Sequence, residues 1–274
     1  RACAQPAPDP NELTTAESKQ LIDQLTRFPQ PPMLVLTGGD PLKRPDIYEL
    51  ISHAVESGLD TAITPSPTPL VTPAAVRRLK EAGIHRMAVS IDGADAETHD
   101  SLRGVAGSFA HTKTIMAAAR DCGIPIQVNT TLSPRNFDQI EAMADMLATE
   151  GILLWSVFFI IPVGRATAEL RLAADQYEAA FDRLHRQSQR QPYGIKTTEA
   201  MHFRRFVAQQ RKLAQRAEGQ HPGARGSSPR YLTLGINDGK GILFVGCSGL
   251  IHPSGFLPLV CGMYPFNSVV DIYQ

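Results

Sequence analysis

One pattern occurs four times in the first part of the chain and restricts its fold more than any other feature. Each time, a stretch with helical spacing of apolar residues ends in Gly, and Leu or Ile then opens an apolar run. The four glycines are Gly58, Gly83, Gly123 and Gly151. Gly is favoured just past a helix end because it adopts the left-handed conformation there without steric cost. The pattern therefore predicts helices that end at these glycines and buried strands that follow them.

The helix starts carry signals of their own. Thr14 followed by Glu17 predicts a capping box, and Asn136 followed by Gln139 predicts another. The expected strands are 33–36, 62–63, 87–91, 126–128 and 154–161. Helices that alternate with such strands form a parallel sheet with helices outside it. The periodicity leaves open whether this sheet is a doubly wound open sheet or a barrel.

Polar or Gly-rich segments follow all five expected strands. These segments are 37–41, 64–66, 90–93, 129–131 and 162–165. Parallel α/β proteins bind their ligands at the carboxyl ends of the strands. Ordinary loop chemistry explains the Gly and Pro residues, but a polar residue at every strand end favours a binding site.

After Arg165 the alternation of strands and helices is expected to stop. Two helices rich in Arg and Gln are expected at 173–189 and 199–219, followed by a linker at 221–229. Short apolar runs between Gly and Pro from 231 to 272 predict hairpins. We therefore expect three parts: a core at 1–170, a helical connector at 171–228 and a small module at 229–274.

Composition excludes several classes of protein. Lys and Arg total 27, as do Asp and Glu, and this balance argues against a nucleic-acid binder that relies on bulk charge. No apolar run approaches the roughly 20 residues of a membrane span. Four cysteines in 274 residues are too few for a disulfide scaffold, so a cytoplasmic setting is expected.

Several stretches together resemble the radical S-adenosylmethionine (SAM) enzymes. LTGGDPLKRPDI (36–47) resembles the family's GGEP motif, with Asp40 in place of Glu. RACA (1–4) resembles the end of the Cys-x3-Cys-x2-Cys cluster motif, with Cys3 as the third cysteine. VSIDGADAETHDSLRGVAGSF (89–109) and SGLIHPSGFLPLVCGMYPFNSVVDIY (248–273) resemble members that carry a SPASM or twitch extension.

The resemblance implies a fold, two cofactors and a set of contacts. The fold is a partial (β/α)6 parallel barrel with a small C-terminal extension, and the family's first strand would lie upstream of Arg1. Cys3 and two upstream cysteines would bind a [4Fe–4S] cluster. The residues implied in SAM binding are Gly38, Gly39, Asp40, Pro41, Ser66, Ser90, Asp92, Arg103, Asn129, Val163 and Arg165. His99 and Asp100 are expected to be structural, and Ser108 is expected to cap the next helix.

The C-terminal cysteines depart from the family pattern. Cys247 and Cys261 flank the expected hairpin at a spacing that differs from the full auxiliary-cluster array. We therefore expect one cluster in the protein and two reduced cysteines here. A zinc site that includes His252 is the less favoured alternative.

The implied activity is reductive cleavage of SAM to a 5′-deoxyadenosyl radical that modifies a peptide or a heme-like tetrapyrrole. An electron donor such as flavodoxin or ferredoxin is the implied partner, and no catalytic residue is assigned. Two alternatives stay open. One is a cluster-free βα enzyme that binds a phosphorylated metabolite, and the other is a non-catalytic relative that binds SAM or a peptide.

Overall fold

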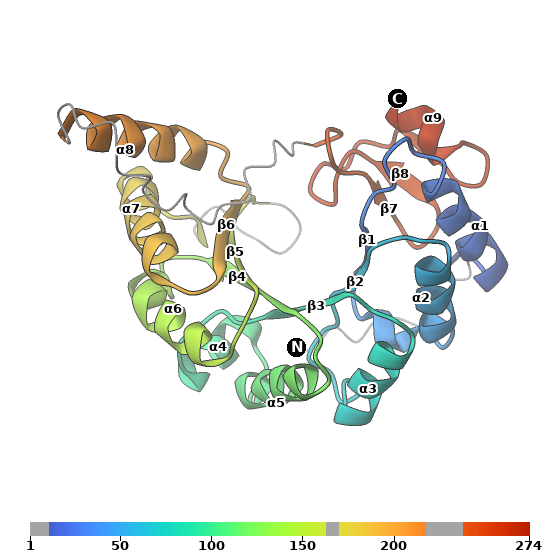
Figure 1. The fold of residues 1–274 in the computed structure, drawn as a ribbon, viewed down its shortest axis with the longest axis horizontal. Helices are drawn as coiled ribbons and strands as arrows, with labels where there is room; N and C mark the ends of the chain where they lie inside the picture. Colours follow the sequence, from blue (N-terminus) through green and yellow to red (C-terminus); the bar gives the residue numbers. More distant parts are fainter. Residues whose placement is uncertain (1–10, 163–169, 218–237) are drawn as a thin grey trace. The chain divides into compact units, whose positions relative to one another are not determined.

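The computed structural model describes residues 11–162, 170–217 and 238–274, and six parallel strands organise its larger sheet. The strands are β1 (Leu34–Leu36), β2 (Thr61–Ile63), β3 (Arg86–Ser90), β4 (Ile126–Leu132), β5 (Leu154–Phe159) and β6 (Gly194–Thr198). They follow one another in sheet order as they do in sequence (Figure 1). A parallel α/β fold of the partial (β/α)6 type is thereby confirmed.

Helices connect these strands, and the predicted glycines end four of them. The α-helices of the core are α1 (Thr15–Leu25), α2 (Ile47–Glu56), α3 (Pro73–Glu81), α4 (Ala96–Arg103), α5 (Ser108–Asp121), α6 (Ile140–Thr149), α7 (Ala174–Arg190) and α8 (Phe203–Ala217). Gly58, Gly83, Gly123 and Gly151 have φ angles of 85°, 91°, 64° and 66°. The capping box of Thr14 and Glu17 is also present. No α-helix in the described part of the chain is long and apolar enough to cross a bilayer.

The second predicted capping box is wrong. Residues Phe137–Gln139 form a short 3-10 helix, η2, and the Asn136 side chain makes no capping bond to it. Asn136 Nδ2 instead donates to the carbonyl oxygens of Asp92 and Thr131, both at 2.9 Å. Asn136 is fully buried, and its amide connects the loops that contain Asp92 and Thr131.

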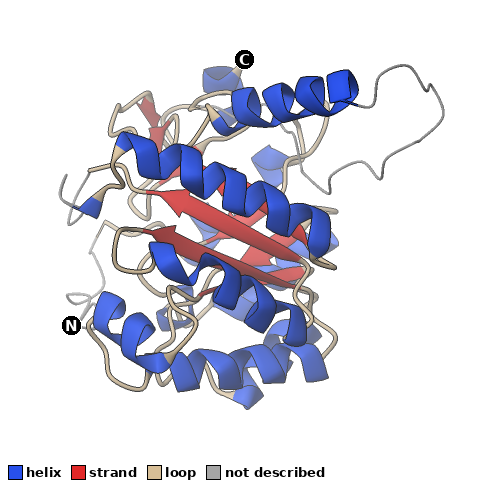
Figure 2. Ribbon diagram, turned by 90° about the vertical axis from the view of Figure 1, so that its left-hand side faces the viewer, coloured by secondary structure: helices blue, strands red, loops and turns tan. Residues whose placement is uncertain are grey.

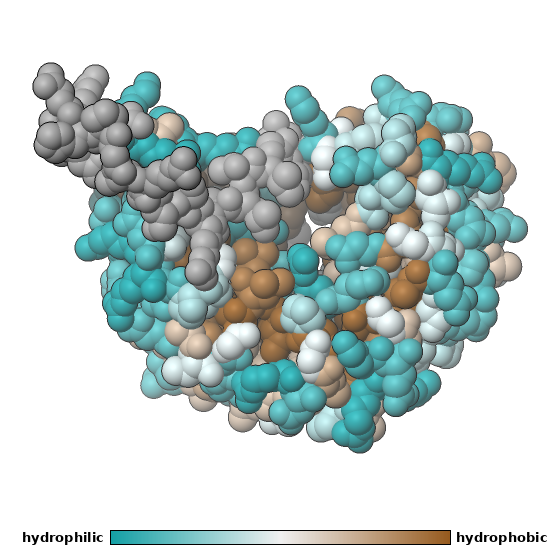
Figure 3. All heavy atoms as spheres, in the orientation of Figure 1, coloured by the Kyte–Doolittle hydropathy of each residue, from teal (hydrophilic) through white to brown (hydrophobic). Residues whose placement is uncertain are grey.

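The chain divides into two compact units, which are described separately. Unit 1 comprises Arg1–Val89, Lys113–Pro125 and Leu234–Gln274. It holds β1 to β3 with α2 and α3, whose inner faces bury Ile51, Ala54, Val76 and Leu79. The outer surface over these two helices is mainly hydrophilic (Figure 3).

Unit 1 also contains a small antiparallel sheet near the C-terminal end of the chain. Its strands are β7 (Phe244–Val245), β8 (Leu250–His252) and β9 (Gly262–Met263), followed by α9 (Val269–Tyr273). Ile251, Tyr264 and Val269 form a buried cluster against which Leu21 and Leu25 of α1 pack. The division into 1–170, 171–228 and 229–274 stays a prediction.

Unit 2 comprises Ser90–Thr112 and Ile126–Thr233 and holds β4, β5 and β6. Helices α6 and α7 cover one face of these strands (Figure 2). Phe159 of β5 packs against Phe181 of α7 with ring centroids 5.4 Å apart.

The expectation that the alternation stops after Arg165 is wrong, because β6 pairs in parallel with β5. Its residues, GIKTT, include only one large apolar side chain, so periodicity did not reveal the strand.

Candidate functional site

In unit 1, the loop that follows β1 is organised around the Asp40 carboxylate. Asp40 caps a 3-10 helix, η1 (Pro41–Lys43), and its Oδ1 accepts the Leu42 N–H at 3.2 Å. Its Oδ2 accepts the Thr68 hydroxyl at 2.6 Å, and the residue is 5% exposed. The carboxylate therefore ties the loop after β1 to the loop after β2.

The backbone before Asp40 has open space beside Gly38. Gly38 has a φ of 130°, and apart from Gly38 and its two chain neighbours no heavy atom of the described residues lies within 4 Å of the position a Cβ would take. The Ser66 hydroxyl, from the loop after β2, donates to the Gly39 carbonyl. The bond holds the carbonyl of the Gly39–Asp40 peptide in place, and space is left beside Gly38, which suits the ammonium group of a methionyl ligand near a carboxylate.

In unit 2, Asp92 follows β3 and anchors a buried network. Its Oδ1 accepts the Thr131 N–H at 2.8 Å, and its Oδ2 lies 2.6 Å from Arg103 Nε. The Asp92 side chain is 6% exposed and that of Arg103 is 32% exposed. The N–H of Arg103 Nε does not point at an acceptor, so we regard this contact as an ion pair without a well-aligned hydrogen bond.

His99 supports the same network from α4. Asp92 N–H donates to His99 Nδ1 at 2.9 Å, and His99 Nε2 lies 3.2 Å from Ser108 Oγ. Since Nδ1 accepts, the neutral ring carries its proton on Nε2. Burial lowers the pKa of His99, which keeps the ring in this neutral form.

Ser108, expected to cap the next helix, is the first residue of α5, and Asp100 supplies capping bonds at this helix start. Asp100 accepts the N–H groups of Gly107 and Phe109 at 2.6 and 2.8 Å, at the start of α5. His99 and Asp100 thus both have structural partners, as the sequence indicated.

The remaining expected contacts occupy strand positions or fall outside the described residues. Ser90 is the last residue of β3, and Asn129 lies in β4, where its Oδ1 accepts Gln127 Nε2 at 2.7 Å. Cys3, Val163 and Arg165 lie outside the described ranges. Assignment of SAM contacts to these residues stays a prediction.

The described residues contain no cluster of three or more candidate metal ligands. Cys247 and Cys261 are exposed free thiols, and His252 Nδ1 lies 3.1 Å from the Leu259 carbonyl oxygen. Cys3, the cluster ligand that the resemblance implies, is not among the described residues.

Sequence reasoning did not pair the two carboxylates with the residues that position them, although Thr131 lies in the polar segment 129–131 identified above. Thr68 bonds Asp40 from 28 residues away, and Thr131 bonds Asp92 from 39 residues away. Thr131 lies next to the last residue of β4 and Thr68 lies in the loop after β2, and these placements near strand ends were the available signal.

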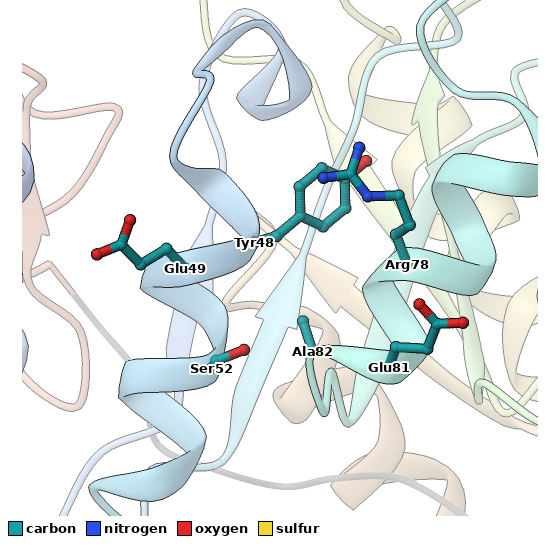
Figure 4. A pocket seen from close by; sticks show the side chains of 6 residues that line it. All are labelled: Tyr48, Glu49, Ser52, Arg78, Glu81 and Ala82. Carbon is teal, nitrogen blue, oxygen red and sulfur yellow. The ribbon is translucent and has the colours of Figure 1, made fainter.

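A concave patch on unit 1 is unrelated to these strand ends. It lies between α2 and α3, where the Arg78 guanidinium carbon stacks 3.8 Å from the centre of the Tyr48 ring (Figure 4). Its lining comes from the outward sides of the two helices and the end of α3, and it includes no strand-end residue.

Comparison with known proteins shows which family the chain resembles. Residues 2–147 match the model of the radical SAM superfamily. The chain is 35% identical over 251 residues to an AdoMet-dependent heme synthase of Methanosarcina barkeri, covering 92% of this chain and 70% of that protein. It is 34% identical over 266 residues to an AdoMet-dependent heme synthase of Nitratidesulfovibrio vulgaris, covering 96% and 70%.

Solved structures agree on the fold. Streptococcus suis SuiB bound to its precursor peptide SuiA superposes with a TM-score of 0.72 at 15% identity. The match covers 100% of this chain and 60% of SuiB, so the chain spans less than two thirds of that protein. Radical SAM enzymes use a [4Fe–4S] cluster and S-adenosylmethionine. The family model, the two relatives and the parallel fold agree, and the chain belongs to the radical SAM superfamily.

Proposed function

We propose that this protein modifies a tetrapyrrole by radical chemistry, as an enzyme related to the heme synthases. The observation that carries the proposal is the 34–35% identity to proteins of that name, which extends over 92–96% of the chain. The match to the family model ends at residue 147. The alignment to the heme synthases extends beyond it and includes β6 and the small antiparallel sheet.

The cofactors supply the difficult step. When bound, the cluster and SAM would supply the radical chemistry, which is one-electron cleavage of the SAM sulfonium to methionine and a 5′-deoxyadenosyl radical able to abstract a hydrogen atom. The protein's own task is to hold SAM in one orientation and to keep water from the radical.

We propose residues for this task in each unit separately. We assign the Gly38–Asp40 loop of unit 1 to the methionyl ammonium, since it offers backbone carbonyls and a fixed carboxylate. In unit 2 the ion pair with Asp92 fixes the Arg103 guanidinium at the end of β3, where its exposed part is available to a carboxylate of SAM.

The cluster and its reduction are proposed from the motif at the start of the chain. Cys3 and two upstream cysteines would bind the iron, and a flavodoxin or ferredoxin would supply the electron. A reducing, cytoplasmic setting agrees with Cys122, Cys247 and Cys261, which are free thiols. Residues 229–274 are proposed as a SPASM- or twitch-like module.

The test uses the full-length protein, reconstituted with iron and sulfide under anaerobic conditions. SAM, a reductant and either iron coproporphyrin III or an unrelated peptide are added, and 5′-deoxyadenosine and substrate mass are measured. We expect deoxyadenosine formation together with a mass change in the tetrapyrrole. Turnover with the peptide and none with the tetrapyrrole would favour a peptide substrate, and SAM binding without deoxyadenosine would favour a non-catalytic relative.

A further inference from the structure

The loop between β6 and α8 places a histidine near the carboxyl end of the sheet in unit 2. Thr198, the last residue of β6, is level with Phe158 of β5 and Thr131 of β4, because these residues pair in register. The Thr131 N–H donates to Asp92, so the loop after β6 starts at the level of that candidate site residue. His202 follows in this loop, where β6 leads into α8 (Figure 1).

The backbone of this loop is held in an uncommon conformation. Glu199 has a φ of 60°, a left-handed value that residues other than Gly rarely adopt. The Phe203 N–H donates to the Ala200 carbonyl at 3.0 Å. The Phe206 N–H donates to the His202 carbonyl at 3.2 Å, which fixes His202 at the start of α8. Backbone of this kind persists where the surrounding structure holds it, and it is concentrated at functional sites.

Aromatic rings hold the imidazole of His202 in place. Its ring centroid lies 5.3 Å from that of Tyr177 and 4.8 Å from that of Phe181, both in α7. Within the described ranges, neither ring nitrogen of His202 has a hydrogen bond or an ion pair. Other histidines differ, because a ring nitrogen has a polar partner in His53, His85, His99 and His252.

His202 therefore offers a nitrogen lone pair to a ligand. The residue is exposed, and its partial burial against the rings lowers the pKa of the imidazole. The positive charge of Arg205 lowers this pKa further, and the Glu178 carboxylate opposes both effects without reversing them. The ring is thus mainly neutral at pH 7. Neutral imidazole is a common metal ligand, and histidine is an axial ligand of iron in many heme proteins.

We propose that His202 binds the iron of a tetrapyrrole as an axial ligand and so makes the site select iron-bearing over metal-free tetrapyrroles. The inference rests on the proposed function and adds a specificity-determining residue to it. In an iron tetrapyrrole the metal lies within a flat ring, and its free coordination positions are above and below that ring. The neutral imidazole donates a lone pair to the iron, with no proton released and no change in oxidation state.

The test compares iron coproporphyrin III with metal-free coproporphyrin III, which has the same ring and the same carboxylates. The full-length protein is used without a histidine tag, because a tag would itself bind iron. His202→Phe keeps an aromatic ring but has no nitrogen, and His202→Cys offers a thiolate instead. Met201→Leu is the matched control, because Met201 is an exposed residue of the same loop.

Affinity for each probe is measured by absorption titration, and the iron ligand is identified by electron paramagnetic resonance. We expect a histidine-type iron signal in wild type and its loss in His202→Phe, with about tenfold weaker binding of the iron probe. Binding of the metal-free probe should not change. His202→Cys should give a thiolate-type signal, which a purely structural role of His202 could not produce. Met201→Leu should match wild type, and thermal unfolding shows that each variant is folded.

A histidine-type signal that is unchanged in His202→Phe overturns the inference and leaves the proposed function standing. Equal weakening of both probes in His202→Phe also overturns it, because His202 would then contact the ring and not the iron. Loss of the signal in Met201→Leu instead would show that methionine is the ligand, against the inference. If wild type binds neither probe, the proposed function itself fails.

Discussion

Variants of Asp92 and Arg103 can separate what their ion pair contributes to the stability of the fold from what Arg103 contributes to SAM binding. Asp92→Asn keeps an oxygen for the Thr131 N–H but removes the charge 2.6 Å from Arg103 Nε. Breaking a fully buried ion pair costs about 3–5 kcal/mol, whereas a fully exposed ion pair contributes about 0–1 kcal/mol. Because 32% of the Arg103 side chain is exposed, water screens the pair. We therefore expect a loss of about 2–3 kcal/mol in the free energy of unfolding.

The assay is a double-mutant cycle without SAM, using Asp92→Asn, Arg103→Gln and the double variant. A loss of this size lowers the melting temperature by about 4–10 °C, and the two substitutions should be strongly non-additive because they remove the same contact. SAM affinity is then measured calorimetrically for the same variants. Additive effects would refute the ion pair as a stabilising contact. SAM affinity unchanged in Arg103→Gln would refute the assignment of Arg103 to SAM.

Three further predictions follow from other contacts of the strand-end loops. Asp40→Ala should weaken SAM binding by calorimetry and also lower the unfolding free energy by about 1.5–3 kcal/mol, because the buried carboxylate accepts two hydrogen bonds. Thr68→Val, which keeps the carboxylate, is its control and should have the smaller effect on SAM. Lowering the pH from 7 to 5 should destabilise the fold in urea titrations, since His99 is neutral when folded and gains a proton near pH 6.5 when unfolded. The His99→Gln variant should show a shallower decline, and an unchanged slope would contradict the argument. Gly93→Ala should cost about 1–3 kcal/mol in thermal unfolding, because the new Cβ would lie 2.7 Å from the His99 backbone nitrogen.

The helices could be predicted from the sequence because their signals are local. A glycine with positive φ and a capping residue act within a few positions, and Gly58, Gly83, Gly123 and Gly151 all behave as expected. Strand β6 could not be predicted, because its five residues become a strand through pairing with β5 and through burial of Ile195. Tertiary packing here overrides a weak local pattern.

The sequence predicted which loops carry the candidate site residues, but not which residues these would contact. The positions of Asp40 and Asp92 follow from the strand ends, but their hydrogen-bond partners lie 28 and 39 residues away. No periodicity connects Thr68 to Asp40 or Thr131 to Asp92. The sequence therefore identified the two carboxylates but did not show that each already accepts a hydrogen bond within its own unit.

The packing of α1 against residues near the end of the chain has a consequence for biosynthesis. Gln24 Oε1 accepts the Val269 N–H across 245 residues, and Leu13 N–H donates to the Cys247 carbonyl. While the ribosome is still translating, the apolar side of α1 has none of these partners. Contacts of such long sequence separation form late, and exposed apolar surface meanwhile attracts chaperones or other nascent chains. The strands β4, β5 and β6 all lie between residues 126 and 198 and can pair much earlier in synthesis. Unit 2 is therefore expected to fold during translation, and unit 1 only after the small antiparallel sheet has left the ribosome.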